Sequence, residues 1–585
     1  MSLSGLDLAV MGAYALVLVG LGLWFARRAS RSTADYFASG RSLPWWVAGT
    51  SMIAASFASD TPLLVTGYVR AKGVWGNWAW WALGTSTVLS TFLFSRLWHR
   101  SGVLTETELS EARYTGPNAA VLRGFKAVFW GLVYASYAAG AGAVTGLSKM
   151  TEATLGWNRT EAILVCAALA AAYVVASGLW GVVATDVFQF AAAIAGALAT
   201  AFYALKAAGG LDHVLASLPA AQTALLPPLS TDSPTGFWTS PMAWFLAFAG
   251  VQWWAWKNSD GGGVLVQRMA ACRNERKAVG APLSYAVGHY ALRAWPWVMV
   301  ALASLVLFPV CPDPEAAYGK VVATVLPAGV RGFVLAWFLA EFMTGVAQFA
   351  NYGASLLVHD GWRRFLRPQA TEKETLRASR LASLLVIAGA VGTAFCTDSV
   401  TQGFEMILKL TAGVGTVYLA RWLWWRVNAM SEIAALAAAI PSVLLAPWAA
   451  RQLHVPEGSA LFGLLFVIGS SACVWLLATF LTPPEDRAHL VAFYRKVRPP
   501  RWGWGPIAAE AGEVTREPWG QALVFWAMGT AGIYLALFGL GGLLLGKGVF
   551  GSLWALGLGA GLILYLVRSI RQGPGPGAFR KPLIP

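Results

Sequence analysis

Long apolar runs separated by short polar segments occupy nearly the whole chain. A helix needs about 20 apolar residues to cross about 30 Å of hydrocarbon, because each residue rises about 1.5 Å. The pattern therefore predicts about fifteen membrane-spanning helices and an all-α polytopic membrane protein. The predicted spans cover residues 6–26, 44–70, 76–98, 120–147, 161–178, 182–206, 238–257, 282–309, 325–357, 379–397, 404–425, 431–448, 460–481, 521–545 and 549–568.

Basic residues gather in every second loop between these spans. Examples are Arg27, Arg28, Arg31 and Arg41 after the first span, and Arg363, Arg364, Arg367, Lys373, Arg377 and Arg380 after the ninth. Cytoplasmic loops carry the excess of Lys and Arg in membrane proteins. We therefore expect a multi-pass protein of the bacterial inner (plasma) membrane, with its N-terminus outside and its C-terminus in the cytoplasm.

Composition excludes several classes of protein. Only 12% of the residues are charged and 57% are hydrophobic, whereas soluble proteins carry about 25% charged residues. The net charge of +15 is spread between apolar runs and forms no single patch, so we do not expect a nucleic-acid partner. Nothing resembles a nucleotide loop, a metal site or a nucleophile elbow, so we expect neither an enzyme nor a cofactor. The expected partners are a small-molecule solute and the lipid bilayer.

Two spans are interrupted by polar and helix-breaking residues. The second contains "GTSMIAASFASDTPLLVTG" and the seventh contains "VQWWAWKNSDGGGVLVQR". Backbone groups freed by such breaks must face protein, water or a ligand, and matching interruptions in two halves of a chain indicate a transporter binding site. Alternatively, residues 257–263 are simply the cytoplasmic end of the seventh span, since glycine runs also mark ordinary helix ends.

Each broken span opens a set of five spans, which indicates two inverted repeats. We expect four regions along the chain. They are an N-terminal helix and cytoplasmic loop (1–43), a first five-helix repeat (44–206), a second five-helix repeat (238–426) and C-terminal accessory helices (427–585). The cytoplasmic segment 483–520 within the last region is predicted to form a short amphipathic helix followed by coil.

Ionisable residues inside the predicted spans are candidates for function, because each costs about 2.5–3.5 kcal/mol on insertion scales. They are Asp60, Asp186, Arg293, Glu341, Glu405 and Lys409. Asp186 could instead lie at the interface, and Arg293 could be a structural residue packed among tryptophan rings. Glu341 lies deep in its span and needs a cation, a proton or a basic partner, for which Lys409 and Lys257 are the candidates.

The motifs resemble those of the sodium:solute symporter family over about residues 1–480. The resemblance rests on "SLPWWVAGTSMIAASFASDTPL" at 42–63, "GLWGVVATDVFQF" at 178–190, "VQRMAACRNERKA" at 266–278 and "FANYGASLLVHDGWRRF" at 349–365. It implies a LeuT-like 5+5 inverted-repeat core with one extra N-terminal and about four extra C-terminal helices. Other stretches, such as "QWWAWKNSDGGG", resemble a less characterised bacterial branch of the family.

The resemblance also implies a cation site between the first and eighth core helices. Backbone carbonyls would come from Ala54 and Phe57, and the eighth core helix places Glu341, Thr344 and Gly345 where the family has a carbonyl and two adjacent hydroxyls. The family's aspartate near the ion path matches Asp186. Because one hydroxyl is lost at Gly345, Glu341 could bind Na⁺ directly, could titrate so that H⁺ is the coupling ion, or could pair with a lysine without any ion coupling.

The expected substrate site lies near the midplane of the membrane. Its candidate residues are Ser56, Asp60, Thr61, Gln252, Trp253, Trp256 and Asn351, with Lys257 suited to a carboxylate and Lys409, Glu405 and Arg293 expected to compensate charge. Hydroxyl, amide and aromatic groups suit a sugar or polyol whose ring stacks on tryptophan. Alternatively, the tryptophans serve packing or form an interfacial belt.

The function expected from these features is secondary active transport. The solute would be a sugar, polyol, amino acid or carboxylate, carried by cation-coupled symport with alternating access in a monomeric functional unit. The alternatives are a proton-coupled or uncoupled transporter and a membrane solute sensor. No kinase-sized segment follows residue 520, which disfavours a sensor, and paired broken helices disfavour a channel.

Overall fold

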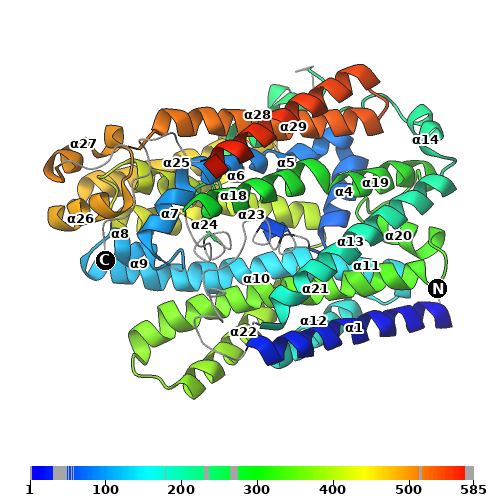
Figure 1. Cartoon of the computed structure of the whole chain (residues 1–585), viewed down its shortest axis with the longest axis horizontal. Coiled ribbons are helices and arrows are strands. Elements are labelled where there is room, and N and C mark those ends of the chain that lie inside the picture. Colours follow the sequence, from blue (N-terminus) through cyan, green and yellow to red (C-terminus); the bar gives the residue numbers. More distant parts are fainter. Residues whose placement is uncertain are drawn as a thin grey trace.

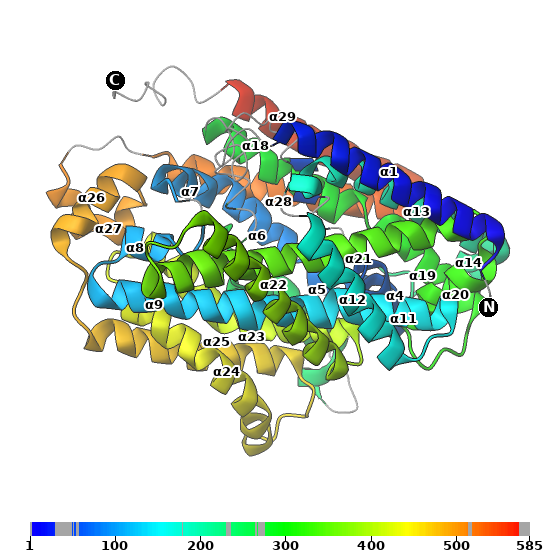
Figure 2. The same cartoon turned by 90° about the horizontal axis from the view of Figure 1, so that it is seen from below.

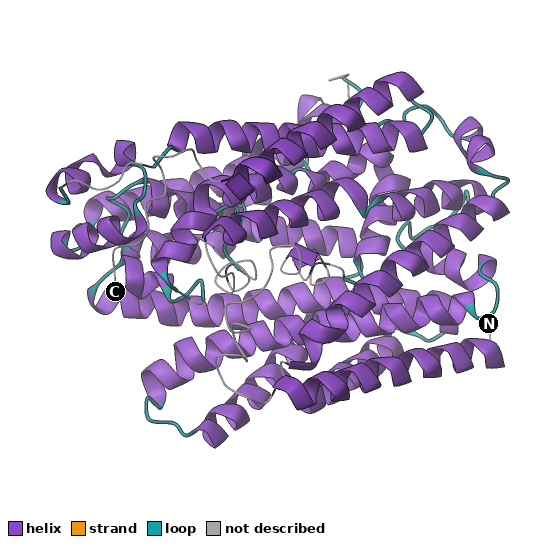
Figure 3. Ribbon diagram, viewed as in Figure 1, coloured by secondary structure: helices purple, strands orange, loops and turns teal. Residues whose placement is uncertain are grey.

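The structure is a computed structural model of the whole chain. It describes residues 3–29, 49–50, 52–53, 56, 58–103, 105–177, 180–229, 236–263, 266, 275–512 and 517–572. This part of the chain is built from helices and loops, as Figure 3 shows, and it contains no strand. The prediction of an all-α protein is therefore confirmed.

The helices of the first half, in chain order, are α1 (Gly5–Ala29), α4 (Thr61–Lys72), η2 (Val74–Asn77), α5 (Trp78–Trp81), α6 (Leu83–Leu89), η3 (Ser90–Phe94), α7 (Ser95–Ser101), α8 (Leu109–Arg113), α9 (Gly116–Val128), η4 (Phe129–Tyr134), α10 (Ala135–Ala138), η5 (Ala139–Val144), α11 (Thr145–Leu155), α12 (Arg159–Ser177), α13 (Trp180–Ala207) and α14 (Leu211–Ser217). Those of the second half are η6 (Phe237–Thr239), α15 (Pro241–Phe245), η7 (Leu246–Gln252), α16 (Trp253–Ala255), α18 (Glu275–Ala286), η8 (Val287–Leu292), α19 (Trp295–Leu307), α20 (Ala316–Val325), α21 (Val330–Ser355), η9 (Leu356–Leu366), α22 (Glu372–Phe395), α23 (Val400–Leu423), α24 (Ala429–Gln452), α25 (Ala460–Leu481), α26 (Arg487–Val497), α27 (Arg501–Glu510), α28 (Trp519–Leu544) and α29 (Val549–Gln572).

Nine helices of the described part are long and apolar enough to cross a membrane. Some combine several elements: α9, η4, α10, η5 and α11 run without interruption from Gly116 to Leu155. The exposed side chains of α28 and α29 include Leu523, Leu553 and Trp554, as expected for surfaces that face lipid. The chain is accordingly a multi-pass membrane protein.

Figure 1 shows the two ends of the bundle, and ion pairs of charged side chains lie at each of them. Helices α8, α26 and α27 lie at one end, called here the α26 end, while α14, α20 and the N-terminus lie at the other, called the α20 end. Figure 2 shows the same separation from below. Ion pairs lie at each end, for example between Arg100 and Glu275 at the α26 end and between Lys149 and Glu315 at the α20 end. In each pair, both residues come from loops that the pattern of basic residues predicts on the same side of the membrane. The direction of insertion stays a prediction.

Both predicted interruptions are turns between helices. In the second span, helical residues 52–53 precede turn residues 56, 59 and 60, and α4 then starts at Thr61. In the seventh span, α16 ends at Ala255 and Trp256 is extended, with φ −79° and ψ 159°. The turn that follows, residues 256–263, is buried in protein rather than exposed at a helix end, since Lys257 and Asp260 are 1% and 0% exposed.

The predicted coil within 483–520 is partly wrong. Helix α26 begins at Arg487, as the amphipathic pattern predicts, but residues 501–510 form a second helix, α27. Trp504 explains the difference, because its fully buried indole packs against Phe493 with ring centroids 5.8 Å apart and donates a hydrogen bond of 2.9 Å to the carbonyl of Trp422. Tertiary packing overrides the weak helix propensity of this Gly- and Pro-rich segment.

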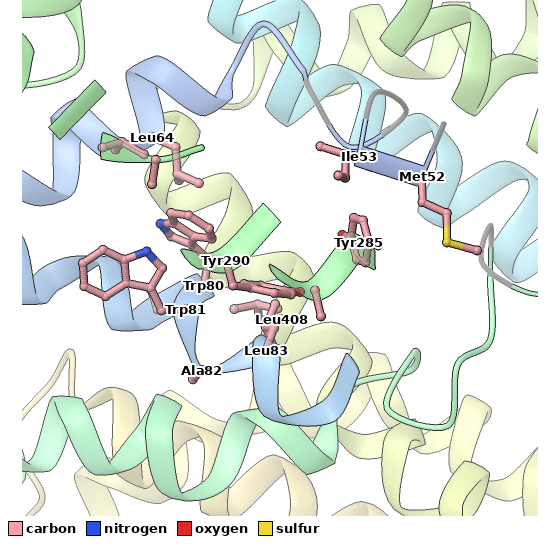
Figure 4. Packing of buried hydrophobic residues seen from close by; sticks show 14 of the residues in the cluster. Met52, Ile53, Leu64, Trp80, Trp81, Ala82, Leu83, Tyr285, Tyr290 and Leu408 are labelled. Carbon is pink, nitrogen blue, oxygen red and sulfur yellow. The ribbon is translucent and has the colours of Figure 1, made fainter. Parts of the chain in front are cut away.

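Aromatic side chains fill the centre of the bundle beside the two breaks. Figure 4 shows Trp80, Tyr285 and Tyr290 among the buried residues of this region. The rings of Trp80 and Tyr290 are 6.1 Å apart, and a side chain at Gly84 would meet the Tyr290 ring at 3.2 Å. Such close packing fixes η8, which carries the residues that face the first break.

Candidate functional site

Three side chains meet at the break in the second span. The hydroxyl of Ser56 donates to the carbonyl of Ile53 at 2.9 Å and shares a hydrogen bond of 2.9 Å with Nδ1 of His289. The guanidinium of Arg293 donates from Nη2 to the carbonyl of Ser56 at 2.9 Å and from Nη1 to its hydroxyl at 3.4 Å. Since His289 and Arg293 are four residues apart on one helical segment, both reach the same break.

Two carboxylates act electrostatically on Arg293. Asp60 and Glu341 both lie within Coulombic range of its guanidinium, which is 4% exposed. Asp60 packs closely against α11 and η5, where a side chain at Gly142 would meet its Oδ2 at 2.4 Å. Glu341 lies on α21 and is 3% exposed, and its charge also acts on Tyr14 of α1. The structure thus gathers two acids and one base at the break.

The two lysines proposed as partners of Glu341 have other partners. Lys257 forms an ion pair of 3.1 Å with Glu106. Lys409 interacts electrostatically with Glu405, which also accepts a hydrogen bond of 3.2 Å from Tyr68. Among the described residues, Arg293 is a basic group that interacts electrostatically with Glu341, in agreement with the expectation that it compensates charge.

The predicted cation ligands are only partly described. Ala54 and Phe57 lie outside the described residues, and the side chain of Asp186, on α13, does as well. On α21, Thr344 donates a hydrogen bond of 3.3 Å to Oε1 of Gln189. Among the described residues, a side chain at Gly345 would meet only Cβ of Ala143, at 3.9 Å. The sodium site itself stays a prediction.

The predicted substrate residues fall into two groups. In the first, buried polar atoms have no partner within the described residues: Oε1 of Gln252 and Nε1 of Trp256. Oγ of Ser59, which was not a predicted substrate residue, is also buried without a partner in this part of the chain. Gln252 is 0% exposed, and its amide nitrogen donates a hydrogen bond of 3.3 Å to the carbonyl of Leu408. In the second group, Trp253 stacks on Trp526 of α28 at 5.8 Å, Thr61 is buried at the start of α4, and Asn351 is half-buried on α21.

The break in the seventh span is held by charged side chains that the sequence analysis did not include. Glu106, in the loop before α8, pairs with Lys257 and accepts hydrogen bonds from the backbone N–H of Gly263 at 2.7 Å and from Tyr352. The ammonium of Lys257 also lies 4.1 Å above the ring of Trp130. These contacts leave Lys257 poorly placed to bind a carboxylate of the substrate.

Asp260, from the same turn, joins a second chain of charges. Its carboxylate accepts from Arg421 at 2.7 Å and from the indole of Trp422 at 2.8 Å. Arg421 lies 3.5 Å from Glu432, which in turn forms a close ion pair with Lys126. All four charged side chains are 1% exposed or less, so their mutual pairing offsets the cost of burying each charge.

Comparisons with known proteins agree with this architecture. The sequence model of the sodium:solute symporter family matches residues 36–439. The chain is 26% identical over 467 residues to "Sodium/glucose cotransporter 4" of Danio rerio, covering 73% of this chain and 69% of that protein. It is 25% identical over 476 residues to "Sodium/glucose cotransporter" of Vibrio parahaemolyticus, covering 76% of this chain and 85% of that protein.

A solved structure is also similar. It is the substrate-bound outward-open state of a Na⁺-coupled sialic acid symporter, with a TM-score of 0.64 and 16% identity over 83% of this chain and 99% of that one. The LeuT-like fold implied by the sequence motifs is therefore confirmed.

Proposed function

The chain belongs to the sodium:solute symporter family, and on that premise we propose that it carries an uncharged polyhydroxylated solute, a sugar or a polyol, together with Na⁺. It is a membrane transporter and not an enzyme. The coupling ion and the class of solute are the proposed parts, and each rests on a different set of residues.

The coupling ion is inferred from the two carboxylates at the first break. Asp60 and Glu341 lie in Coulombic range of Arg293, in a region where a charge is costly unless it is compensated. Na⁺ prefers hard oxygen ligands, and Glu341 and Thr344 supply a carboxylate and a hydroxyl on neighbouring turns of α21. This observation carries the proposal of sodium coupling. Protonation of Glu341 would serve the same electrostatic purpose, so H⁺ is the second candidate ion.

The class of solute is inferred from the polar atoms beside the breaks. Oε1 of Gln252, Oγ of Ser59 and Nε1 of Trp256 are buried without a partner in the described residues, and they combine acceptors with donors. Buried polar atoms are expensive unless they are hydrogen-bonded, and solute hydroxyl groups can both donate and accept. Because Lys257 is engaged by Glu106, a carboxylate solute is disfavoured. The glucose cotransporters among the relatives transport solutes of this kind, according to their names.

The setting of the transporter follows from the charge pattern. We place it in the bacterial inner membrane as a monomeric functional unit, with the α26 end in the cytoplasm and the α20 end outside. Labelling of Cys396, which is exposed near the α20 end, by a membrane-impermeant maleimide in whole cells tests this orientation. Labelling only after the cells are broken would contradict it.

A thermal-shift screen of the purified protein tests the class of solute. Sugars, polyols, amino acids and carboxylates are compared with and without Na⁺, since a ligand stabilises the folded state by RT ln(1 + [L]/Kd). We expect the midpoint of unfolding to rise with a sugar or polyol, and to rise further when Na⁺ is present. Stabilisation by carboxylates alone would contradict the proposal.

A further inference from the structure

The turn 256–263 is tied to the rest of the bundle by charged contacts on both sides. Asp260 contacts Arg421 of α23, and Glu106 contacts Lys257 and the N–H of Gly263. We name Glu106, Lys257, Asp260, Arg421, Glu432 and Lys126 the turn-locking cluster. We propose that this cluster is the gate that closes the solute site toward the α26 end, with Glu106 and Asp260 as positioning residues that hold the turn closed. The proposal rests on the alternating access of the proposed function.

The cluster joins elements that are distant in the sequence. Glu106 and Lys257 are 151 residues apart, and Arg421 and Asp260 are 161 residues apart. Trp98 of α7 also donates a hydrogen bond of 2.7 Å to the carbonyl of Asp260. A path from the site to the α26 end can open beside the turn only if contacts of this kind separate.

Burial makes the cluster an all-or-none contact. Lys257, Asp260, Arg421 and Glu432 are each 1% exposed or less. Removing one partner of a buried ion pair is strongly unfavourable because it leaves the other charge uncompensated. The charged side chains must therefore separate at the same time, and each must then be solvated by water that enters the path to the α26 end. Closed and hydrated arrangements are then two discrete states, as a gate requires.

The backbone of the turn is suited to movement. Gly261 and Gly263 have φ angles of 86° and 70°, in the left-handed region where glycine has no side-chain penalty. Hinges are short segments that absorb large changes of φ and ψ. Glycines at these positions let the turn change conformation while α16 remains intact.

The α20 end offers a matched control. Glu315 is buried there and pairs with Lys149 at 2.7 Å, while it accepts hydrogen bonds from the backbone N–H groups of Val400 and Thr401 at 2.9 Å each. Glu315→Gln therefore removes one buried ion pair at the opposite end of the bundle, while Lys149 keeps Asp313 as a partner at 2.7 Å. Comparison with this variant distinguishes local opening at the α26 end from a loss of stability of the whole protein.

Hydrogen–deuterium exchange of the full chain in lipid nanodiscs tests the gate without any solute. We expect Glu106→Gln and Asp260→Asn to speed exchange of residues 253–263 by about tenfold or more, and to leave α28 and α29 unchanged. Glu315→Gln should leave 253–263 at the wild-type rate. Exchange of this segment at the wild-type rate in both variants would overturn the proposal, and so would equal acceleration by Glu315→Gln.

A double variant keeps the test decisive if a single variant fails to fold. Glu106→Gln with Lys257→Met removes both charges of one pair, so no charge is buried alone. The double variant should still speed exchange of residues 253–263. Its midpoint of thermal unfolding should lie closer to the wild-type midpoint than the midpoints of Glu106→Gln alone and of Lys257→Met alone. Wild-type exchange in the double variant would overturn the proposal.

Transport kinetics supply a readout that a purely structural role would not change. A weaker gate populates the state open to the α26 end, and the apparent dissociation constant rises as the binding-competent fraction falls. We expect the double variant to raise KM for uptake from the α20 end severalfold, without a matching fall in the maximal rate. Equal falls in both kcat and kcat/KM would contradict the gate. Absence of any uptake by the wild type would instead contradict the proposed function and leave the exchange result standing.

Discussion

The guanidinium of Arg293 donates a hydrogen bond of 2.9 Å to the backbone carbonyl of Ser56, where the second span is broken. A carbonyl freed by a broken helix needs a partner at membrane depth, and Arg293 provides one from η8's C-terminal end. The same guanidinium lies in Coulombic range of Asp60 and Glu341. Arg293 therefore links the broken helix to both acids: it binds the free carbonyl of Ser56 and compensates the charges of Asp60 and Glu341.

Glu341→Gln is expected to raise the Na⁺ concentration needed for half-maximal uptake by at least about tenfold, because a neutral amide is a weaker ligand for Na⁺ than a carboxylate. Uptake into proteoliposomes over a range of Na⁺ concentrations and pH values measures the change. Glu405→Gln is the matched control, since Glu405 accepts a hydrogen bond from Tyr68 and interacts electrostatically with Lys409 instead. Unchanged Na⁺ and pH dependence in Glu341→Gln would exclude Glu341 from coupling.

Gly345→Ser is expected to strengthen sodium dependence. Among the described residues, Cβ at this position would meet only Ala143, at 3.9 Å, so none of them blocks the new hydroxyl. An added oxygen ligand should lower the Na⁺ concentration for half-maximal uptake severalfold. Gly392→Ser, on α22, makes the same change where no described residue lies within 4 Å, and it should have no effect. Identical sodium curves for both variants would count against a cation site beside Gly345.

Gln252→Leu is expected to weaken solute binding by about tenfold, which corresponds to the loss of one hydrogen bond. The amide is 0% exposed and its Oε1 has no partner in the described residues. Isothermal titration with the solute found in the thermal-shift screen measures the effect. Gln402→Leu on the exposed part of α23 is the control. Solute affinity equal to the wild type would remove Gln252 from the site.

The pair of Glu315 with Lys149 is expected to make stability fall at low pH. Burial alone would raise the pKa of Glu315, but Lys149 and the hydrogen bonds from Ser399 and Thr401 hold the pKa below its usual value of 4.5. A lowered folded-state pKa contributes stability at pH values above the unfolded-state pKa, and this contribution is lost as pH falls through the folded-state pKa.

Thermal unfolding between pH 7 and pH 3 measures this effect. Glu315→Gln should lower stability at pH 7 by about 1–3 kcal/mol, the usual cost of losing a partner of buried polar groups, because Lys149 keeps Asp313 as a partner at 2.7 Å. The variant should lose less stability in acid than the wild type. Parallel pH profiles for the two proteins would show that Glu315 is not the titrating group.

The sequence predicted the long apolar helices well, because their signal is local. The spans predicted at 431–448 and 460–481 correspond to α24 (Ala429–Gln452) and α25 (Ala460–Leu481). Both broken spans were also recognisable, since polar, Gly and Pro residues stand out in an apolar run. In α27, by contrast, the deciding contact is the tertiary burial of Trp504, which no local pattern reports.

The charged contacts of the site could be predicted only in part. Lys257 and Asp260 stood out inside a span, but Glu106 lies in a predicted loop and Arg421 near the end of another predicted span, where charges are common. Pairing across more than 150 residues depends on how the helices pack. His289 carried one usable signal, its position four residues before Arg293 on a helical segment.

Uptake driven by an imposed Na⁺ gradient tests sodium-coupled transport of a polyhydroxylated solute most directly. Proteoliposomes containing the purified chain are loaded with K⁺ buffer and diluted into Na⁺ buffer or K⁺ buffer at equal pH, with the radiolabelled sugar or polyol from the thermal-shift screen outside. We expect transient accumulation above equilibrium in Na⁺ buffer only, and we expect a sodium ionophore to abolish it. Equal uptake in both buffers, or accumulation driven by a pH gradient without Na⁺, would contradict it.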